Sequence, residues 1–445
     1  MSLPPTRPAL HVMSKNWIND PNGLCWYRGR WHMFFQHNPS GGSWGNMSWG
    51  HVSSSDLVNW DEHPVALMHE ADHGCFSGSA VVDEHDTAGF GAGALVAAYT
   101  MDHQPGSPWH GRQTQSIAWS SDGITFTKLG HPVLDRESQN FRDPKVSWDH
   151  ERDRWAMVAV EAHENAVVHH HSANLVDWTY SGEFRFPELA TPTWECPDLF
   201  PMTVGGRTRW VLVLSVNPGA IQGGSGTRWF LGDFDGEVFR AADDDPGLWL
   251  DWGSDNYAGV SFGDVPDGRR ILVGWLNNWD YAHDLAEAGF PGMLTVPRQL
   301  SLVVADGAVA LVQQPVDEVL ASLGEMQAVE VDGQVWQAPA VGWVELDLVA
   351  PQALTIGSHV LTWADDRLVL DRAPMAGVAP AKQVSAPLRP GLDRLSLGLL
   401  VDHGCLEVYA DGGRTVLTSL ALDDTGPRAL TWTGQVERLR ASSAD

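Results

Sequence analysis

The chain has 445 residues, which is more than one hydrophobic core usually serves, so we expect one large domain and one smaller domain. Its 28 basic and 56 acidic residues give a formal net charge of −28, which repels nucleic acid and anionic membrane surfaces. We therefore expect neither as a partner, and the charge predicts neither the fold nor the oligomeric state.

The first residues, Met1-Ser-Leu-Pro-Pro-Thr-Arg-Pro8, lack the basic and apolar regions of a signal peptide, and no later apolar run is long enough to cross a bilayer. The chain as given is expected to be soluble and cytoplasmic, and secreted if a signal peptide was trimmed from it. Its cysteines form no C-x-x-C pair, which favours buried free thiols over a zinc site or a disulfide scaffold. They are Cys25, Cys75, Cys196 and Cys405.

Short apolar or aromatic runs bounded by Gly, Pro, Asp and Asn predict β-strands along the first two thirds of the chain. The clearest runs are residues 31–35, 94–99, 155–160, 210–214 and 271–275. Helical periodicity is nearly absent outside residues 316–323. With 45 glycines and 27 prolines available for turns, the sequence predicts an all-β fold.

A weak repeat accompanies these strands, in which an Asp or Asn turn is followed four residues later by an aromatic residue. It occurs in residues 55–60, 121–126, 173–178 and 234–239. A spacing of about 50 to 65 residues is typical of the four-stranded blades of a β-propeller. Chance recurrence of Asp-Gly turns in an all-β chain is the alternative interpretation.

The composition of the chain changes after about Leu311, where tryptophan becomes rarer. A short amphipathic piece, residues 315–323, follows. Alternating apolar and polar strands then continue to the end, for example in residues 342–349 and 404–410. Such alternation is typical of a β-sandwich with one buried face per strand. We expect a propeller domain over residues 1–310, a linker over 311–324 and a sandwich over 325–445.

Three acidic residues lie in segments that contain proline: Asn16-Trp-Ile-Asn-Asp-Pro-Asn-Gly23, Phe141-Arg-Asp-Pro-Lys-Val146 and Trp194-Glu-Cys-Pro-Asp-Leu-Phe200. Proline fixes its own φ and biases the preceding residue toward extended geometry, so the backbone directs each acidic side chain. A proline turn on the surface is the alternative for any one segment alone.

Taken together, the three segments suit glycosidic cleavage, which needs one ionised and one protonated carboxyl group. The aromatic wall of Trp194 would favour a protonated Glu195, because desolvation raises a carboxyl pKa. The amides of Asn19 and Asn22 would favour an ionised Asp20. Likewise, Arg142 beside Asp143 would favour a second permanent anion.

These segments resemble the three signature motifs of glycoside hydrolase family 32, which comprises invertases, levanases and inulinases. Further similar segments follow in the family's order: Phe35-Gln-His-Asn-Pro39, Trp49-Gly-His51, Phe76-Ser-Gly-Ser79, Asp251-Trp-Gly-Ser-Asp-Asn-Tyr-Ala258, Gly274-Trp-Leu-Asn277 and Val296-Pro-Arg-Gln-Leu300. The resemblance implies a five-bladed β-propeller followed by a β-sandwich. In the sandwich, Tyr409 and Ala410 stand where Phe and Asn are more usual.

The resemblance also implies a retaining β-fructosidase that cleaves terminal fructosyl bonds in sucrose, fructo-oligosaccharides or fructans. Asp20 would be the nucleophile, Glu195 the general acid/base, and Asp143 would hold fructose hydroxyls. The implied fructose pocket contains Asn19, Gln36, Trp44, Ser77 and Arg142. Neither a cofactor nor a metal is expected, and the run 169–171 of three histidines is no metal site, because neighbours on a strand face opposite ways.

Three other functions remain as alternatives. A fructosyltransferase would use the same fructosyl-enzyme intermediate, and no residue decides between water and a sugar as acceptor. A sialidase-like propeller would need several arginines converging on a carboxylate, and the segment around Asp20 argues against it. An inactive fructan-binding module is disfavoured because all three carboxylates are present. The preferred substrate, the choice between exo and endo action, and the oligomeric state stay open.

Overall fold

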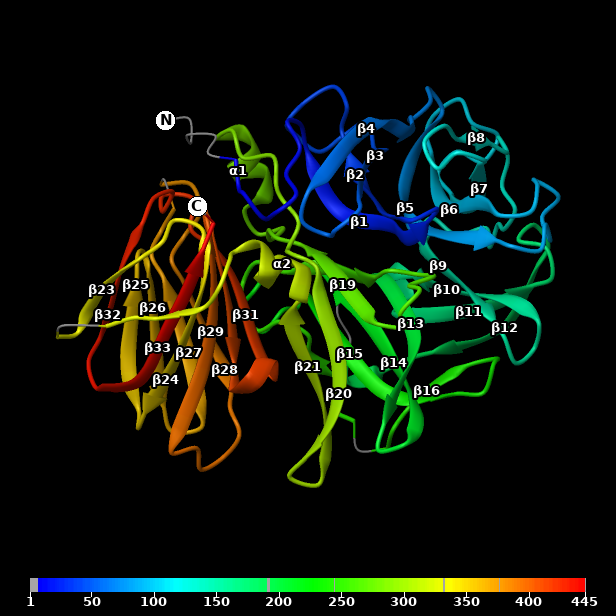
Figure 1. Cartoon of the computed structure of the whole chain (residues 1–445). Helices are drawn as coiled ribbons and strands as arrows, with labels where there is room; N and C mark the ends of the chain where they lie inside the picture. The colour runs from blue at the N-terminus through cyan, green and yellow to red at the C-terminus, as the bar shows by residue number, and fades with distance from the viewer. Residues whose placement is uncertain (1–6, 190–192, 244, 331–332, 376, 445) are drawn as a thin grey trace.

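The computed structural model describes residues 7–189, 193–243, 245–330, 333–375 and 377–444, and it places two β-rich units side by side (Figure 1). In the described part of the first unit, five antiparallel sheets each have four strands along one path, and the short strand β17 also pairs with β15 in the fourth sheet. The prediction of an all-β fold is confirmed.

The first sheet contains β1 (Ile18–Tyr27), β2 (Arg30–His37), β3 (Ser48–Ser54) and β4 (Trp60–Leu67), and the second contains β5 (His73–Asp83), β6 (Ala94–His103), β7 (Gln113–Ser120) and β8 (Thr127–Lys128). The third contains β9 (Phe141–Asp149), β10 (Arg154–Glu161), β11 (Ala166–Ser172) and β12 (Trp178–Phe184). The fourth contains β13 (Trp194–Val204), β14 (Arg207–Val216), β15 (Gly226–Phe234), β16 (Phe239–Ala241) and β17 (Leu248–Trp249). The fifth contains β18 (Tyr257–Ser261), β19 (Arg270–Trp275), β20 (Arg298–Ala305) and β21 (Ala308–Pro315).

The first strands of the five sheets contact one another in the order β1, β5, β9, β13 and β18, and β18 closes the ring against β1. The described sheets are therefore the five blades of a propeller, and each blade runs outward from this inner ring. The five apolar runs read from the sequence lie in β2, β6, β10, β14 and β19, the second strand of each blade. Neighbouring blades cover both faces of these strands, which explains why they are almost wholly apolar.

The recurring turn joins the third strand to the fourth in the first four blades. Asp56 Oδ1 accepts hydrogen bonds from the backbone N–H groups of Val58 and Asn59, at 3.0 and 2.7 Å. The same pair of contacts recurs at Asp122, Asn174 and Asp235. An Asp or Asn side chain that bonds its own backbone replaces a backbone turn, so the repeat is confirmed as a signature of the blades.

The fifth blade lacks this Asp or Asn turn because its last hairpin has a different turn. Asp306 and Gly307 both have positive φ, 55° and 82°, between the paired residues Ala305 and Ala308. This is the geometry of a two-residue hairpin turn, which needs no aromatic residue four positions later.

The second unit is a sandwich of two six-stranded sheets within the described residues. One sheet has the order β22 (Gln327–Ala328), β33 (Gln435–Ser443), β24 (Gly342–Val349), β29 (Arg394–Asp402), β30 (Cys405–Ala410) and β31 (Thr415–Leu420). The other has the order β23 (Val335–Ala338), β32 (Arg428–Trp432), β25 (Gln352–Ile356), β26 (His359–Ala364), β27 (Arg367–Arg372) and β28 (Lys382–Pro387). One apolar cluster fills the space between them.

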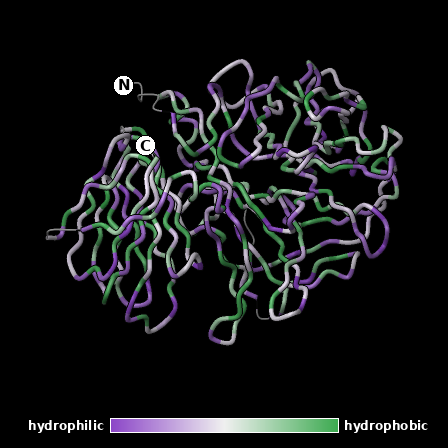
Figure 2. Tube along the Cα trace, viewed as in Figure 1, coloured by the Kyte–Doolittle hydropathy of each residue, from purple (hydrophilic) through white to green (hydrophobic). Residues whose placement is uncertain are grey.

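Hydrophobic residues run along the strands of both units, and hydrophilic residues gather in the loops (Figure 2). The four cysteines are buried free thiols, as predicted. None of the described helices combines the length and apolar character needed to span a bilayer.

Helices are few and short in the described ranges: α1 (Ala282–Glu287), α2 (Asp317–Ser322), η1 (Ala162–Glu164), η2 (Pro187–Leu189) and η3 (Asp411–Gly413). Helix α2 confirms the helical piece read over 316–323, whereas the equally short helix α1 was not predicted. Strand β21, the last strand of the fifth blade, ends at Pro315, and α2 begins at Asp317. The predicted boundaries of the linker between the two domains, residues 311 and 324, stay a proposal.

Candidate active site

Each of the five innermost strands has a register shift in its first half, where residues are left without a partner on the second strand. Such bulges bend a strand and redirect its side chains. The unpaired residues are Asn19 and Asp20 in β1, Ser77 in β5, Asp143 and Pro144 in β9, Cys196 and Pro197 in β13, and Ala258 and Gly259 in β18. The propeller thus brings residues of the three acidic segments together on its axis.

Three of these unpaired residues have the left-handed backbone conformation, which is unusual for residues other than glycine. The φ angles are 62° at Asp143, 48° at Cys196 and 53° at Ala258. Strained positions of this kind cluster at functional sites, where the surrounding fold holds them. Pro144 and Pro197 follow two of them at positions where a missing N–H costs no ladder hydrogen bond.

Asp20 contacts its neighbours through one carboxylate oxygen. Ser77 Oγ donates to Asp20 Oδ2 at 2.7 Å, and Cys196 Sγ lies 3.7 Å from the same oxygen. The other oxygen, Oδ1, is buried and has no hydrogen-bond partner among the described residues. Burial and the charge of Glu195 raise the pKa of Asp20 to about 6, although the bond from Ser77 acts in the opposite direction.

Glu195 is held from two sides by residues of the neighbouring blades. Arg142 of β9 donates to Glu195 Oε1 from Nε at 3.2 Å and from Nη2 at 3.1 Å. Tyr257 of β18 donates its phenol hydrogen to Oε2. Gln113 Oε1 accepts from Arg142 Nη1 at 3.2 Å and so fixes the guanidinium. Glu195 is the most exposed member of this group, with 22% of its side chain accessible.

Asp143 is almost completely buried, whereas Asp20 and Glu195 are partly accessible. The backbone N–H of Cys196 donates to Asp143 Oδ2 at 2.9 Å, and Arg142 Nε lies 3.9 Å away. Burial raises the pKa of Asp143, and the charges of Glu195 and Asp20 add to this effect, whereas Arg142 opposes it.

Two expectations about the environment of these carboxylates are wrong. Trp194 does not wall Glu195, because adjacent residues of a strand face opposite ways: its indole donates to Leu189 O at 3.2 Å and packs near Phe184. Arg142 does not keep Asp143 a permanent anion, because its guanidinium bonds to Glu195 instead and the pKa of Asp143 is raised.

The remaining predicted pocket residues lie at different depths. Asn19 is buried in β1 and accepts a hydrogen bond from the indole of Trp17 at 2.7 Å. Gln36 is buried in β2 and donates to Cys75 O at 3.0 Å. Trp44 lies in the loop between β2 and β3, is 46% exposed, and has its ring edge-on to Phe76 at 6.2 Å.

Sequence reasoning did not assign Tyr257 or Cys196 to the site. Both lie in segments that were singled out, so a signal was present. Their contacts depend on which side chains the bulges of β13 and β18 turn toward the axis, and a bulge cannot be read from residue types alone.

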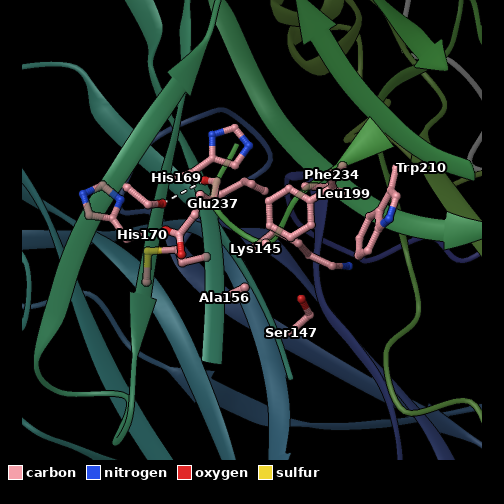
Figure 3. A pocket seen from close by; sticks show the side chains of 13 residues that line it. Lys145, Ser147, Ala156, His169, His170, Leu199, Trp210, Phe234 and Glu237 are labelled. Carbon is pink, nitrogen blue, oxygen red and sulfur yellow. Dashed lines mark hydrogen bonds between the residues drawn. The ribbon is translucent and has the colours of Figure 1, made fainter. Parts of the chain in front are cut away.

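A separate pocket lies between the third and fourth blades and contains none of the three carboxylates (Figure 3). Its lining includes His169, His170, Trp210, Phe234 and Lys145, the last of these from the innermost strand β9. Lys145 also lines a small cavity at the carboxylate site, together with Asp143, Ser77 and Cys196 among others.

One group of three potential metal ligands occurs in the described residues, Glu70, Asp72 and His73, and it is not part of the carboxylate site. Lys128 Nζ already lies 3.0 Å from Glu70 Oε1, and Asp72 Oδ1 lies 2.9 Å from His73 Nδ1. These contacts satisfy the charges of the group and give no argument for an ion.

The arrangement on the axis suits acid/base and nucleophilic chemistry at one small centre. Arg142 contacts two of the three carboxylates, Asp143 and Glu195, and burial together with the repulsion among the carboxylates raises the pKa of both Asp20 and Asp143. Glycoside cleavage requires a pair of carboxyl groups, one that attacks and one that donates a proton. Asp20, with one free oxygen, and the neighbouring Glu195 could form such a pair.

Comparison with known proteins agrees with this chemistry. Residues 11–315 match the N-terminal domain of glycosyl hydrolases family 32, and residues 364–438 match the C-terminal domain of the same family. A levanase from Bacillus subtilis is 37% identical over an alignment that covers 95% of this chain and 67% of the levanase. The chain thus spans about two thirds of the length of that relative.

Solved structures of similar proteins have the same fold. An extracellular exo-inulinase from Aspergillus awamori is 33% identical over 98% of this chain and 94% of its own length. The crystal structure of exo-inulinase from that organism has a TM-score of 0.89 at 31% identity, over 99% of this chain and 98% of the other. A β-fructofuranosidase from Schwanniomyces occidentalis, complexed with fructosyl-erythritol, has a TM-score of 0.84 at 27% identity, over 98% and 97% of the two chains.

Proposed function

The chain belongs to glycosyl hydrolase family 32, and from this premise we propose that it hydrolyses terminal β-fructofuranosyl bonds by a retaining, double-displacement mechanism. The observation that carries the proposal is the geometry of Asp20, with one oxygen held by Ser77 and the other free, beside a second carboxyl group that the neighbouring blades hold.

Asp20 is the proposed nucleophile. Its free Oδ1 attacks the anomeric carbon of fructose, while the bond from Ser77 fixes the carboxylate plane. Burial beside Glu195 disfavours its negative charge, and formation of a covalent fructosyl ester removes that charge. The ester is then hydrolysed by water.

Glu195 is the proposed general acid/base. It protonates the departing glycosidic oxygen in the first step and takes a proton from water in the second. Its two oxygens are fixed by Arg142 and Tyr257, so the proton is delivered from a defined position. The greater exposure of Glu195 suits a group that must exchange protons with incoming water.

Asp143 is proposed to bind fructose hydroxyls as positive charge develops on the sugar. Asn19, Gln36, Ser77 and Arg142 complete the polar wall of the pocket, and the exposed Trp44 offers an aromatic face at its outer side. The proposed ligand is a small fructoside or fructan chain. Nucleic acid and membranes are not proposed as partners, because the net charge repels both.

The proposal is tested by incubating the protein with sucrose, 1-kestose, inulin and levan and following the products by NMR. Release of β-fructofuranose as the first anomer supports hydrolysis with retention. A trisaccharide that accumulates at high sucrose at the expense of free fructose would instead indicate a transferase. Binding of fructan without product would indicate an inactive module.

The cytoplasmic location expected from the first residues stays a proposal, with secretion as the alternative. The extracellular exo-inulinase among the relatives favours secretion. Fractionation of the producing cells and medium would decide between them.

A further inference from the structure

The phenol of Tyr257 is one of the groups that hold Glu195. Tyr257 is buried, and burial together with the charge of Glu195 raises its pKa well above the ordinary value, so the phenol stays a donor at all relevant pH values. It donates to Glu195 Oε2, while Arg142 donates to Oε1. A shift of Tyr257 would therefore turn the carboxyl group that is proposed to deliver the proton.

The segment that leads into Tyr257, residues 251–256, lies against strand β31 of the sandwich. Trp252 N donates to Val416 O at 2.8 Å, and Asp255 N donates to Thr418 O at 3.2 Å. Thr418 N donates in return to Asp251 Oδ1 at 2.9 Å. The segment is thus bonded to the edge of the sandwich along its length, although it belongs to the propeller.

Gly253 shows how closely the two chains approach. A Cβ atom at this position would lie 2.1 Å from Thr418 O and 2.2 Å from Thr418 N. Backbone atoms cannot move away as the end of a flexible side chain can, so only glycine fits here. The separation between segment and sandwich is therefore fixed by direct backbone contact.

Buried charges fix the two ends of the segment to the sandwich. Arg298 bridges Asp251 and the sandwich residue Glu407, with both distances at 2.8 Å. At the other end, Arg372 of the sandwich lies 3.4 Å from Asp255. All of these side chains are almost inaccessible, so a displaced carboxylate would be left buried without its partner.

From these contacts we propose that the sandwich positions the general acid/base: strand β31 fixes the segment 251–256, and this segment places Tyr257 against Glu195. Thr418 is then a positioning residue that acts on proton delivery through Tyr257. The inference rests on the proposed function of Glu195, and it gives the sandwich a part in catalysis as well as in stability.

The test uses Thr418→Val in the full chain, which keeps the side-chain shape and removes the hydroxyl that bonds to Asp251 and Arg298. Thr415→Val is the matched control, because Thr415 lies on the same strand and its hydroxyl bonds only within the sandwich, to Pro387 O at 2.7 Å. Gly253→Ala is a second, stronger displacement of the same segment.

Each variant is assayed on sucrose and on 4-nitrophenyl β-fructofuranoside, whose leaving group needs no proton. We expect Thr418→Val and Gly253→Ala to lower kcat on sucrose by about tenfold and to change kcat on the nitrophenyl substrate less than about twofold. Thr415→Val is expected to change neither. General damage to the fold would lower both rates together.

The route through Tyr257 is tested by a double-mutant cycle with Tyr257→Phe. In that background, Thr418→Val should lower kcat on sucrose by less than about twofold further, because the contact through which it acts is already gone. Full additivity, equal losses on both substrates, or no effect of either displacing variant would overturn the inference. Failure of the proposed function would look different, since the wild-type protein would then release no fructose from either substrate.

Discussion

Two buried groups of carboxylates in this protein differ in the cations that surround them. On the propeller axis, Arg142 contacts Asp143 and Glu195, and Asp20 is repelled by the charge of Glu195. Burial and mutual repulsion raise the pKa of Asp20 to about 6 and also raise that of Asp143. The negative charges of Asp20 and Asp143 are therefore disfavoured, which suits the proposed role of Asp20, whose charge would be removed when it bonds to the sugar.

Between the propeller and the sandwich, nearby cations outweigh the effect of burial on the carboxylates. Glu407 lies 2.8 Å from Arg298 and 3.0 Å from His11, and His11 also lies 2.8 Å from Asp402. Burial opposes ionisation here too, but Arg298 and His11 lower the pKa of Glu407 to about 2. The comparison teaches that burial alone does not make a carboxylate reactive, and that the number of cations within reach decides whether it is a reagent or a structural anchor.

Asp20→Asn should have the largest effect, because an amide keeps the shape of the carboxylate and is a poor nucleophile. We expect kcat on sucrose to fall on the order of 10⁴-fold or more. The free energy of unfolding at pH 7 should be unchanged or higher, because a repelled charge is removed. A variant that kept more than about a tenth of the wild-type kcat would remove Asp20 from the nucleophile role.

Glu195→Ala should have the next largest effect, and only on substrates whose leaving group needs a proton. We expect kcat on sucrose to fall by about 10³-fold, with a much smaller loss on the nitrophenyl substrate. Azide should restore turnover and give fructosyl azide of retained configuration. An inverted first product, or equal losses without rescue, would show that Glu195 has another role.

Glu407→Gln should act on stability, because it leaves the buried cations Arg298 and His11 short of a partner. The free energy of unfolding in urea is expected to fall by about 3–5 kcal/mol. The same substitution at the exposed Glu62 is the matched control and should change it by less than about 0.5 kcal/mol. A similarly small change at Glu407 would contradict the anchoring role of the interdomain network.

The smallest effects are in the pH dependence of stability, where the two groups should respond in opposite directions. The pKa of Asp20 is raised in the fold, so its charge destabilises the protein increasingly as the pH rises from about 4 through about 6. The pKa of Glu407 is lowered, so its stabilising contribution is present above the unfolded value of about 4.3 and is lost as the pH falls toward about 2.

Urea unfolding across this pH range, with wild type, Asp20→Asn and Glu407→Gln, measures both effects. The gain from Asp20→Asn should grow between about pH 4 and 6, and the loss from Glu407→Gln should shrink below about pH 4. Kinetics offer a related check: kcat/KM should fall about tenfold per pH unit well below pH 6, as the proposed nucleophile is protonated. Parallel pH profiles for the two variants would contradict the contrast between the groups.

Much of the architecture could be predicted because its signals are local. The turns at Asp56, Asp122, Asn174 and Asp235 bond to their own backbone within three residues, so their spacing marked the blades directly. The second strands of the blades are apolar on both faces and needed no knowledge of their neighbours. The Asp306-Gly307 turn was missed because it lacks the aromatic residue four positions later that marks the other four turns.

The sequence by itself singled out the three carboxylates that the propeller brings together, since proline and the surrounding residues mark Asp20, Asp143 and Glu195 in three separate segments. Only the tertiary structure decided their partners. Arg142 is adjacent to Asp143 in sequence but bonds to Glu195, Trp194 turns away from its neighbour, and Tyr257 arrives from another blade. The physical reason is that bulges and blade closure determine which way a side chain points, and the charge of a buried carboxyl group depends on the groups it meets across that ring.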